Sequence, residues 1–403
     1  MKKILLLGGS RQQIIAIEMA KKLGYYTILC DYLPDNPGQN YSDKFYLEST
    51  TDKEAILKIA KEEKIDGIVA YASDPAAPTA AYVAEKLGLP TNPYKSVNIL
   101  CNKDLFREFL KENNFCTPKA KGYSNIMDAK NDLEKKVFQF PVLVKPVDSS
   151  GSKGVKRIDD LENFEEIVDI ALGFSKSKRF IIEEYVEKFG YQIAGDGFVV
   201  GGKLKFRCFG NDHFDSTGIN PYVPISASFP YNMPKRVHDK IHNEIQRLLT
   251  LLNMSMGAYN FDIRIDKNEN VYLMEIGPRN GGNFIPQVTR YITGVDMIEY
   301  TIKAAVGENC DDIELKEPVG YYSYYALHSS KSGILKEIII DEKVEMENIL
   351  EKYLNYNIGE KIPAFTGANG CLGIFIMKFS SMEEMLDMMD NSEKWIKIIL
   401  EEK

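Results

Sequence analysis

The sequence lacks the patterns that mark several common protein classes. No apolar run reaches the roughly 18 residues of a membrane-spanning helix, so we expect no membrane partner. The six cysteines include no CxxC pair, and the four histidines do not follow metal-ligand spacing. These absences predict a reduced, cytoplasmic protein whose thiols are structural.

A strongly basic stripe is also missing. The formal net charge is −8, from 50 lysines and arginines against 58 aspartates and glutamates. Because proteins bind nucleic-acid backbones through clustered positive charge, we expect no nucleic-acid partner.

Two well-known nucleotide patterns are absent or incomplete. Residues 149–154 (SSGSKG) lack the Gly-Lys-Ser/Thr ending of a Walker A loop, and no HRD-type kinase segment follows them. Residues 8–13 (GGSRQQ), with Asp31 about twenty residues later, resemble a dinucleotide fingerprint without its third glycine. An NAD(P)-dependent oxidoreductase built on this segment is therefore kept as an alternative function.

Strands and helices alternate through the first ninety residues of a chain long enough for more than one core. Short apolar strands are expected at 3–9, 26–32, 43–50 and 66–74, with helices at 12–23, 52–64 and 75–88. This alternation predicts a doubly wound parallel sheet of the α/β class. Pro90 and Pro93 mark a boundary, which gives a predicted N-terminal domain at 1–95.

The rest of the chain has a different pattern of predicted strands and helices. Strands separated by short turns, with helices between them, predict an α+β domain at 96–312 that contains an antiparallel sheet. Residues 313–403 are predicted to form a small C-terminal α+β cap. Its last segment, 380–400, is predicted as a helix that begins with Ser380 and Glu383 as a capping box.

The most informative stretch surrounds residue 270. Asp262 lies in YNFDIRI and Glu275 in VYLMEIGPRNGG, with the turn signal DKNEN between two alternating segments, so the pattern predicts a β-hairpin. Its strands can aim both carboxylates at one point, beside Arg279. Carboxylate oxygens are the ligands that Mg²⁺ uses when it is held against nucleotide phosphates. The alternative is that both acids are ordinary solvated strand residues.

A phosphate cradle is predicted around residue 150. Lys145 ends a buried strand and is followed by a flexible loop that includes Ser150, Gly151, Ser152 and Gly154. Such a loop supplies a nest of backbone N–H donors, and the lysine adds a point charge. A surface hairpin turn would fit the same loop.

Nucleoside contacts are expected further along the chain. Glu183 and Glu184 end the strand RFIIEEYV, where backbone groups and a carboxylate can meet an adenine ring. Gln192 follows the next loop and is placed to bond a ribose hydroxyl.

Taken in order, these segments resemble the ATP-grasp superfamily. The resemblance rests on Lys103 in CNKDLFREFL, Lys145 in VLVKPVDSSGSKGV, the EEYV segment, Asp262, and Glu275 to Arg279. It covers almost the whole chain and is nearest to the carboxylate–amine ligases, a group that contains biotin carboxylase, the carbamoyl-phosphate synthetase large subunit and purine-pathway enzymes.

The resemblance implies ATP as cofactor together with Mg²⁺, or Mn²⁺ in its place. By this likeness Lys103 and Lys145 contact phosphates, the loop 151–154 folds over them, and Asp262 with Glu275 binds the metal. The adenine is held by Glu183 and the backbone of Val186, and the ribose by Gln192.

The same resemblance implies an ATP- and Mg²⁺-dependent ligase with a small carboxylate and an amine as its partners. The carboxylate attacks the γ-phosphate, and the amine then displaces phosphate from the acyl phosphate. Lys145 and Arg279 are the implied catalytic residues, and Gly281 and Gly282 allow close backbone approach to the substrate. Asp74 is expected either to meet the amine or to cap a helix.

Two positions depart from the family pattern. Gly277 stands where the family often has Asn, and Gln192 where it often has Glu. The first departure leaves a non-catalytic ATP-binding regulatory protein as an alternative function. The resemblance leaves monomer and homodimer open, although dimers are common in such enzymes.

Overall fold

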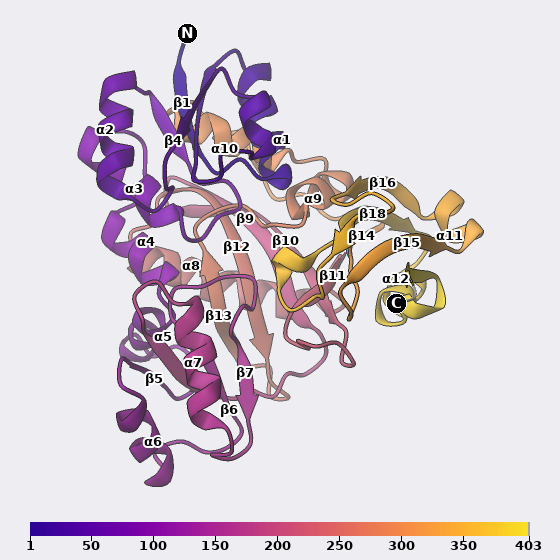
Figure 1. Ribbon diagram of the computed structural model, residues 1–403. Helices are drawn as coiled ribbons and strands as arrows, with labels where there is room; N and C mark the ends of the chain where they lie inside the picture. The colour runs from indigo at the N-terminus through magenta and orange to yellow at the C-terminus, as the bar shows by residue number, and fades with distance from the viewer. Residues whose placement is uncertain (402–403) are drawn as a thin grey trace.

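The N-terminal segment forms a parallel sheet at the top of Figure 1. The computed structural model describes residues 1–401, and this sheet has the order β3-β2-β1-β4. Its strands are β1 (Lys3–Leu7), β2 (Tyr26–Asp31), β3 (Lys44–Leu47) and β4 (Gly67–Val69). The run KILLL is buried on both faces, as expected for a central parallel strand.

Helices cover both faces of this sheet, so the predicted doubly wound architecture is confirmed. On one face Ile4 and Leu6 pack with α1 (Ile14–Lys22) and α10 (Met297–Ala305). On the other face Leu5 and Leu7 share a core with α2 (Lys53–Glu63) and α3 (Ala77–Leu87). Because α10 comes from the region predicted as the central domain, the chain returns to the N-terminal layer near residue 300. The domain boundaries stay a prediction.

A small antiparallel sheet lies at the opposite end of the molecule (Figure 1). Its order is β5-β8-β6-β7. The strands are β5 (Ala120–Tyr123), β6 (Val142–Pro146), β7 (Lys156–Ile158) and β8 (Phe180–Glu184). The helices α6 (Ile126–Glu134) and α7 (Phe164–Phe174) share its core, and α5 (Lys103–Glu112) contacts β5.

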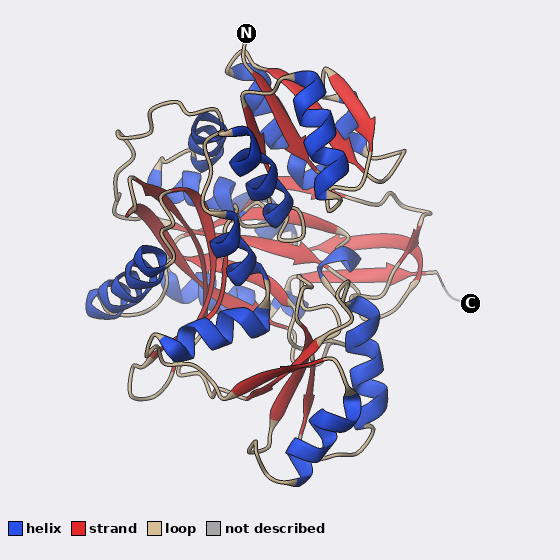
Figure 2. Cartoon of the chain, turned by 90° about the vertical axis from the view of Figure 1, so that its left-hand side faces the viewer, coloured by secondary structure: helices blue, strands red, loops and turns tan. Residues whose placement is uncertain are grey.

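A long antiparallel sheet runs between these two units and into the C-terminal region, with the order β13-β12-β9-β10-β11-β14-β18-β16. Its first strands are β9 (Gln192–Val200), β10 (Lys203–Phe214), β11 (Pro224–Phe229), β12 (Met256–Ile265) and β13 (Val271–Gly277). It continues through β14 (Tyr321–Leu327), β18 (Gly373–Phe379) and β16 (Ile349–Leu354). The strands of the predicted C-terminal cap therefore extend the central sheet, and Figure 1 labels β14, β18 and β16 beyond β11. In Figure 2 adjoining red strands cross the middle of the molecule.

Further elements complete the described chain. The helices are α4 (Tyr94–Cys101), α8 (Lys235–Leu251), α9 (Ile285–Thr293), α11 (Glu342–Glu347) and α12 (Met382–Asp390). A small sheet has the order β17-β15-β19, with β15 (Gly333–Ile340), β17 (Lys361–Ile362) and β19 (Ile396–Leu400). Within residues 1–401, no helix is both long and apolar enough to cross a membrane.

The predicted helix at 380–400 is wrong in its second half. The helix α12 stops at Asp390, and β19 pairs with β15 as an antiparallel strand. The sequence IKIIL is rich in β-branched residues, which pack well on a sheet, and long-range pairing decides between the two structures. The predicted capping box is also wrong. Ser381 is the N-cap and its hydroxyl accepts from the Glu384 N–H, whereas the Glu384 carboxylate accepts from the Ser380 N–H and not from the N-cap N–H.

Candidate active site

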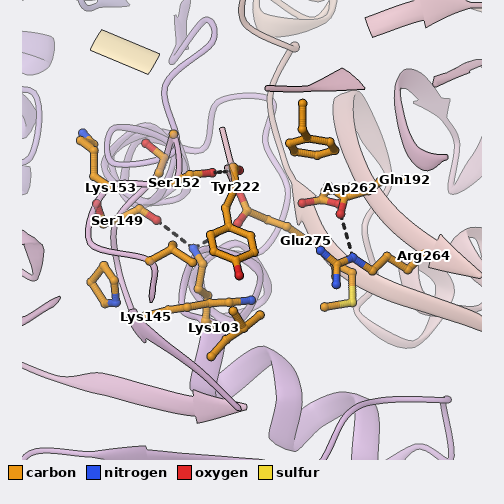
Figure 3. A pocket seen from close by; sticks show the side chains of 17 residues that line it. Lys103, Lys145, Ser149, Ser152, Lys153, Gln192, Tyr222, Asp262, Arg264 and Glu275 are labelled. Carbon is orange, nitrogen blue, oxygen red and sulfur yellow. Dashed lines mark hydrogen bonds and ion pairs between the residues drawn. The ribbon is translucent and has the colours of Figure 1, made fainter. Parts of the chain in front are cut away.

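The predicted hairpin is formed by β12 and β13. Asp262 pairs directly with Glu275 across the two strands, and a register shift follows between Asp262 and Ile263. Directly paired residues project from the same face of a sheet. Both side chains line one cavity together with Lys103 and Lys145 (Figure 3).

The Asp262 carboxylate fits a cation. The pKa of the Asp262 carboxyl is raised to about 6. Burial is the main cause, and the neighbouring Glu275 contributes to the rise. Its Oδ1 is buried and has no hydrogen-bond partner in the described part of the chain. A buried, unsatisfied carboxylate oxygen is costly unless a cation or donor reaches it. Within residues 1–401, no group of three His, Cys, Asp or Glu side chains is placed to hold a metal ion. Mg²⁺ is commonly bound through one or two carboxylates, with phosphate and water as its other ligands.

Lys103, the first residue of α5, connects this hairpin to the glycine-containing loop. Its Nζ donates to the Ser149 carbonyl at 2.8 Å and lies 3.1 Å from Glu275 Oε2. Burial opposes the charge on Lys103, but the attraction of Glu275 outweighs it and raises the pKa of the ammonium. The side chain is therefore a charged cation between loop and hairpin.

Glu183 forms two buried ion pairs that the sequence did not predict. One carboxylate oxygen accepts from Arg107 Nε at 2.6 Å and the other from Lys145 Nζ at 2.7 Å, and the side chain is 1% exposed. Burial alone would raise the pKa of Glu183, but Arg107 and Lys145 lower it to about 2. Both oxygens are engaged by these two cations, one of which, Lys145, lines the cavity, and a contact between Glu183 and adenine stays a prediction. Glu183 orients Lys145.

The loop after β6 covers the cavity. Ser149, Ser150, Gly151, Ser152 and Lys153 line it, whereas Gly154 packs elsewhere: a Cβ there would lie 2.9 Å from the ring of Phe174. Gly151 and Ser152 have φ of 68° and 56°, in the left-handed region. The turned backbone keeps the loop over a cavity of about 90 Å³.

Two of the residues expected at the nucleoside end, Val186 and Gln192, both accept from Arg264, whereas Glu184 bonds elsewhere. The Glu184 carboxylate accepts from the Gln139 N–H at 2.8 Å, and the Val186 carbonyl accepts from Arg264 Nη1 at 3.0 Å. Gln192 lines the cavity and is bonded by its Oε1 to Arg264 Nε at 2.7 Å. Its Nε2 donates to Asp212 at 3.3 Å. An adenine or ribose contact by these residues stays a prediction.

Asp74 neither faces the cavity freely nor caps α3. Its two oxygens accept from Nε and Nη2 of Arg279 at 2.7 and 2.6 Å, a bidentate pair, while Ala76 is the N-cap of α3. Burial opposes the charge on Asp74, but Arg279 outweighs it and lowers the pKa of the carboxyl. The expected cap role of Asp74 is therefore wrong, and its contact with the amine stays a prediction. In the structure Asp74 fixes the Arg279 guanidinium across the two layers.

The pair also explains the departure at Gly277. A Cβ at this position would lie 2.9 Å from Asp74 Oδ1 and 3.1 Å from Arg279 Cζ. Such contacts are tighter than ordinary van der Waals packing. A side chain at this position would press on the ion pair, so Asp74 and Arg279 would have to shift to admit an asparagine.

The two following glycines approach the protein's own side chains. The Gly281 N–H donates to both oxygens of Asp196, at 2.9 and 3.1 Å, and a Cβ on Gly281 would lie 2.7 Å from Asp196 Oδ1. Gly282 lies beside Gln12, whose Oε1 is 3.3 Å from a built Cβ. The expected close approach is therefore made to Asp196 and Gln12, and substrate contact stays a prediction.

A second cavity adjoins the first. It has a volume of about 190 Å³ and shares Lys103, Ser149 and Glu275 with the cavity under the loop. Asp74 and Lys176 also line it. Lys103 and Glu275 thus stand in a wall common to both spaces.

Sequence analysis did not single out three residues that line the first cavity or hold its side chains in place. Arg107 lies four residues after Lys103 on α5, and Arg264 two residues after Asp262 on β12, so helical and strand periodicity could have indicated both. Tyr222 lies in the irregular segment before β11 and carries no such signal.

The fingerprint-like segment does not favour a dinucleotide. The Gly9 N–H donates to Asp31 Oδ2 at 2.7 Å, and the Leu33 N–H donates to Asp31 Oδ1 at 2.8 Å. The Gln13 amide lies against Gly8, with its Nε2 donating to the Tyr71 carbonyl at 2.8 Å. The acid that would bind a ribose is thus used inside the protein.

Sequence comparison identifies relatives of this arrangement. Residues 138–287 match the family described as the ATP-grasp domain. The carbamoyl phosphate synthase large chain of Clostridium botulinum is 25% identical over 320 residues, which cover 78% of this chain and 29% of that protein. The chain therefore spans less than a third of the length of this relative.

Structural comparison extends the likeness to the whole chain. An L-amino acid ligase from Bacillus licheniformis superposes with a TM-score of 0.81 at 21% identity, over 100% of this chain and 99% of the other. The biotin carboxylase domain of Hydrogenobacter thermophilus 2-oxoglutarate carboxylase, solved with MgADP and bicarbonate, gives a TM-score of 0.76 at 16% identity, over 99% and 90%. At these identities the likeness shows a common fold. Residues 138–287 therefore match an ATP-grasp domain, within a chain whose overall fold these structures share.

Proposed function

We propose that the protein is an ATP- and Mg²⁺-dependent ligase that activates a small carboxylate as an acyl phosphate and joins it to an amine, with release of ADP and phosphate. One observation carries the proposal: Lys103 and Glu275 stand in the wall between the cavity under the loop and the adjoining cavity. A phosphoryl group at this wall is within reach of groups in both spaces.

The first cavity is proposed to take the phosphates of ATP. Backbone N–H groups of the loop 149–153 and the ammonium groups of Lys103 and Lys145 supply positive charge there. The similar biotin carboxylase domain was solved with MgADP, which supports a nucleotide as the ligand of this fold. The nucleoside would extend toward Gln192 and the strand end at Glu184.

Asp262 and Glu275 are the proposed ligands of Mg²⁺. When bound, the metal neutralises negative charge on the β- and γ-phosphates. The unsatisfied Oδ1 of Asp262 and the pairing of the two acids support the assignment. Lys103 holds Glu275 at 3.1 Å before any nucleotide arrives, so one ligand is oriented in advance.

The second cavity is proposed to take the carboxylate. From there its oxygen attacks the γ-phosphorus, and the leaving ADP carries the electron pair of the broken P–O bond. Arg279, fixed by Asp74, is proposed to stabilise the oxyanion that forms when the amine attacks the acyl phosphate. The amine would reach it from a cavity of about 720 Å³ between residues 10–15 and the C-terminal region.

A thermal-shift titration followed by a phosphate-release screen tests the proposal. ATP with Mg²⁺ is expected to raise the melting temperature through binding linkage. Phosphate and ADP are then expected only when a suitable acid and amine are both present. AMP as product, or stabilisation by ATP without turnover across a broad panel, would contradict the ligase and favour an adenylating enzyme or a regulator.

A further inference from the structure

The outer side of the glycine-containing loop contacts two segments from distant parts of the sequence. One is the connection between β10 and β11, where the Ser152 hydroxyl donates to the Tyr222 carbonyl at 2.7 Å (Figure 3). The other is the segment 366–370, where the Ala368 N–H donates to the Gly151 carbonyl at 3.4 Å. The loop is therefore held from outside as well as from Lys103 beneath it.

Asn220 joins these three segments through one side-chain amide. Its Nδ2 donates to the Ser152 carbonyl at 3.0 Å and to the Thr366 carbonyl at 2.9 Å. Its Oδ1 accepts from the Tyr222 N–H at 3.1 Å. The donor side of the amide thus bridges loop and C-terminal segment, while the acceptor side shapes the local turn.

We propose that Asn220 is a positioning residue, a latch that keeps the loop 149–154 closed against the segment 366–370. Its effect on catalysis rests on the proposed function, but the latch itself does not. The closed loop leaves about 90 Å³ beneath it, whereas pockets for small-molecule ligands commonly measure about 300–1,000 Å³. The loop has to move outward to admit a nucleotide, and the two bonds donated by Asn220 have to break.

The latch has a chemical purpose in a ligase that forms an acyl phosphate. Such an intermediate is lost to water if the site opens before the amine attacks. Asn220 does not touch the reacting atoms. It sets how long the loop stays closed. A weaker latch therefore lets more of the acyl phosphate be hydrolysed and less of it be joined to the amine.

Substitutions can distinguish the proposed latch from a role of Asn220 that is confined to its own turn. Asn220→Asp retains an oxygen for the Tyr222 N–H but loses the two N–H donors and places a negative charge beside two carbonyls. Thr217→Ala is the matched control, because Thr217 lies in the same connection and its hydroxyl bonds only within it, to Asp215 at 2.7 Å. Ser152→Ala removes the loop's own bond to Tyr222 and serves as a second, independent variant.

Limited trypsin digestion of the full chain without ligands tests the latch. Cleavage after Lys153, measured by mass spectrometry, is expected to be about ten times faster in Asn220→Asp, two to five times faster in Ser152→Ala, and unchanged in Thr217→Ala. Melting temperatures and cleavage after Lys267, in the β12–β13 turn, show whether the variants are folded. The proposal is overturned if Asn220→Asp and Ser152→Ala are both folded and are cleaved after Lys153 at the same rate as the wild type.

An activity measurement separates the latch from the function. With ATP, Mg²⁺, an active acid and its amine, Asn220→Asp is expected to hydrolyse more ATP per ligation event than the wild type, with Thr217→Ala unchanged. Faster digestion without any ATP turnover in the wild type would uphold the latch and remove the ligase. Turnover in the wild type, with digestion and coupling both unaffected by Asn220→Asp, would uphold the ligase and remove the latch.

Discussion

At the residue scale, the central question is what the Glu275 charge does. Glu275→Gln preserves shape but removes charge where the proposed metal is clamped. We expect turnover to fall by roughly 10²–10³-fold, comparable to the loss of one preorganised electrostatic contact. Steady-state phosphate release at saturating Mg²⁺ measures it.

Stability gives the control for this variant. The substitution relieves repulsion between Glu275 and Asp262 but also removes the ion pair with Lys103. These effects oppose each other, so we expect the free energy of unfolding without nucleotide to change by less than about 1 kcal/mol. Near-wild-type turnover would eliminate the metal assignment.

Gly277 offers a second test at this scale. Gly277→Asn introduces the residue that the family often has, but its Cβ would press on the Asp74–Arg279 pair. Misplacing a positioned group by about 1 Å costs roughly 10² in rate, so we expect that loss in turnover with little change in nucleotide affinity. Gly173→Asn, on an exposed position of α7 with open space around it, is the matched control. A gain in Mg²⁺ affinity or rate would show instead that the site lacks a ligand.

The positions of single residues were predictable from the sequence where the alternation of polar and apolar residues shows which side chains share a face. Asp262 and Glu275 alternate with apolar neighbours on strands joined by a turn, so their convergence followed from the pattern. Asp74 and Arg279 are 205 residues apart, and Glu183 and Arg107 76 apart. No local pattern reports such partners, and for this reason the ion pairs of Asp74 and Glu183 could not be predicted from the sequence.

At the scale of elements, one buried carboxylate ties α5 to β6 and β8. Glu183→Gln leaves Arg107 and Lys145 as buried cations without their anion. Breaking a buried pair in this way costs about 3–5 kcal/mol, so we expect a loss of that size in the free energy of unfolding, measured with urea. Glu184→Gln, a neighbouring and more exposed position, is expected to cost less than half as much. Equal losses would refute the assignment of Glu183 as an anchor.

The same carboxylate predicts a pH dependence. Its pKa is about 2 in the folded protein against 4.5 for an ordinary glutamate, so the folded state binds this proton less readily than the unfolded chain. Its contribution to stability is complete above pH 4.5 and is lost as the pH falls toward 2, by roughly 3 kcal/mol. Urea unfolding of wild type and Glu183→Gln between pH 6 and about 3 checks this: the difference between them should shrink as the pH falls. A constant difference would contradict the prediction.

Elements whose identity depends on distant pairing were the hardest to predict. The segment IKIIL continues a helical region in sequence, yet β15 recruits it as β19. By contrast, the β12–β13 hairpin and the alternating elements of the first ninety residues carry their own turns and caps, and the structure confirms them.

At the scale of the whole molecule, the α/β and α+β fold class could be predicted from the sequence. The way in which the predicted domains share sheets and layers could not. The strands β14, β18 and β16 extend the central sheet, and α10 returns to cover the N-terminal sheet. Antiparallel neighbours can come from any distance along the chain, so periodicity shows that a strand exists and does not show which sheet it joins. These connections bring the N-terminal Asp74 to Arg279 and the C-terminal segment 366–370 to the loop over the cavity.

The most direct test of the central claim traps the activated acid. The protein is incubated with ATP, Mg²⁺, a panel of small carboxylic acids and hydroxylamine, which reacts with acyl phosphates in place of the unknown amine. Hydroxamate and ADP are expected in equal amounts for at least one acid, with both lost in Glu275→Gln. Hydroxamate accompanied by AMP, or no nucleotide turnover with any acid, would contradict an acyl-phosphate ligase.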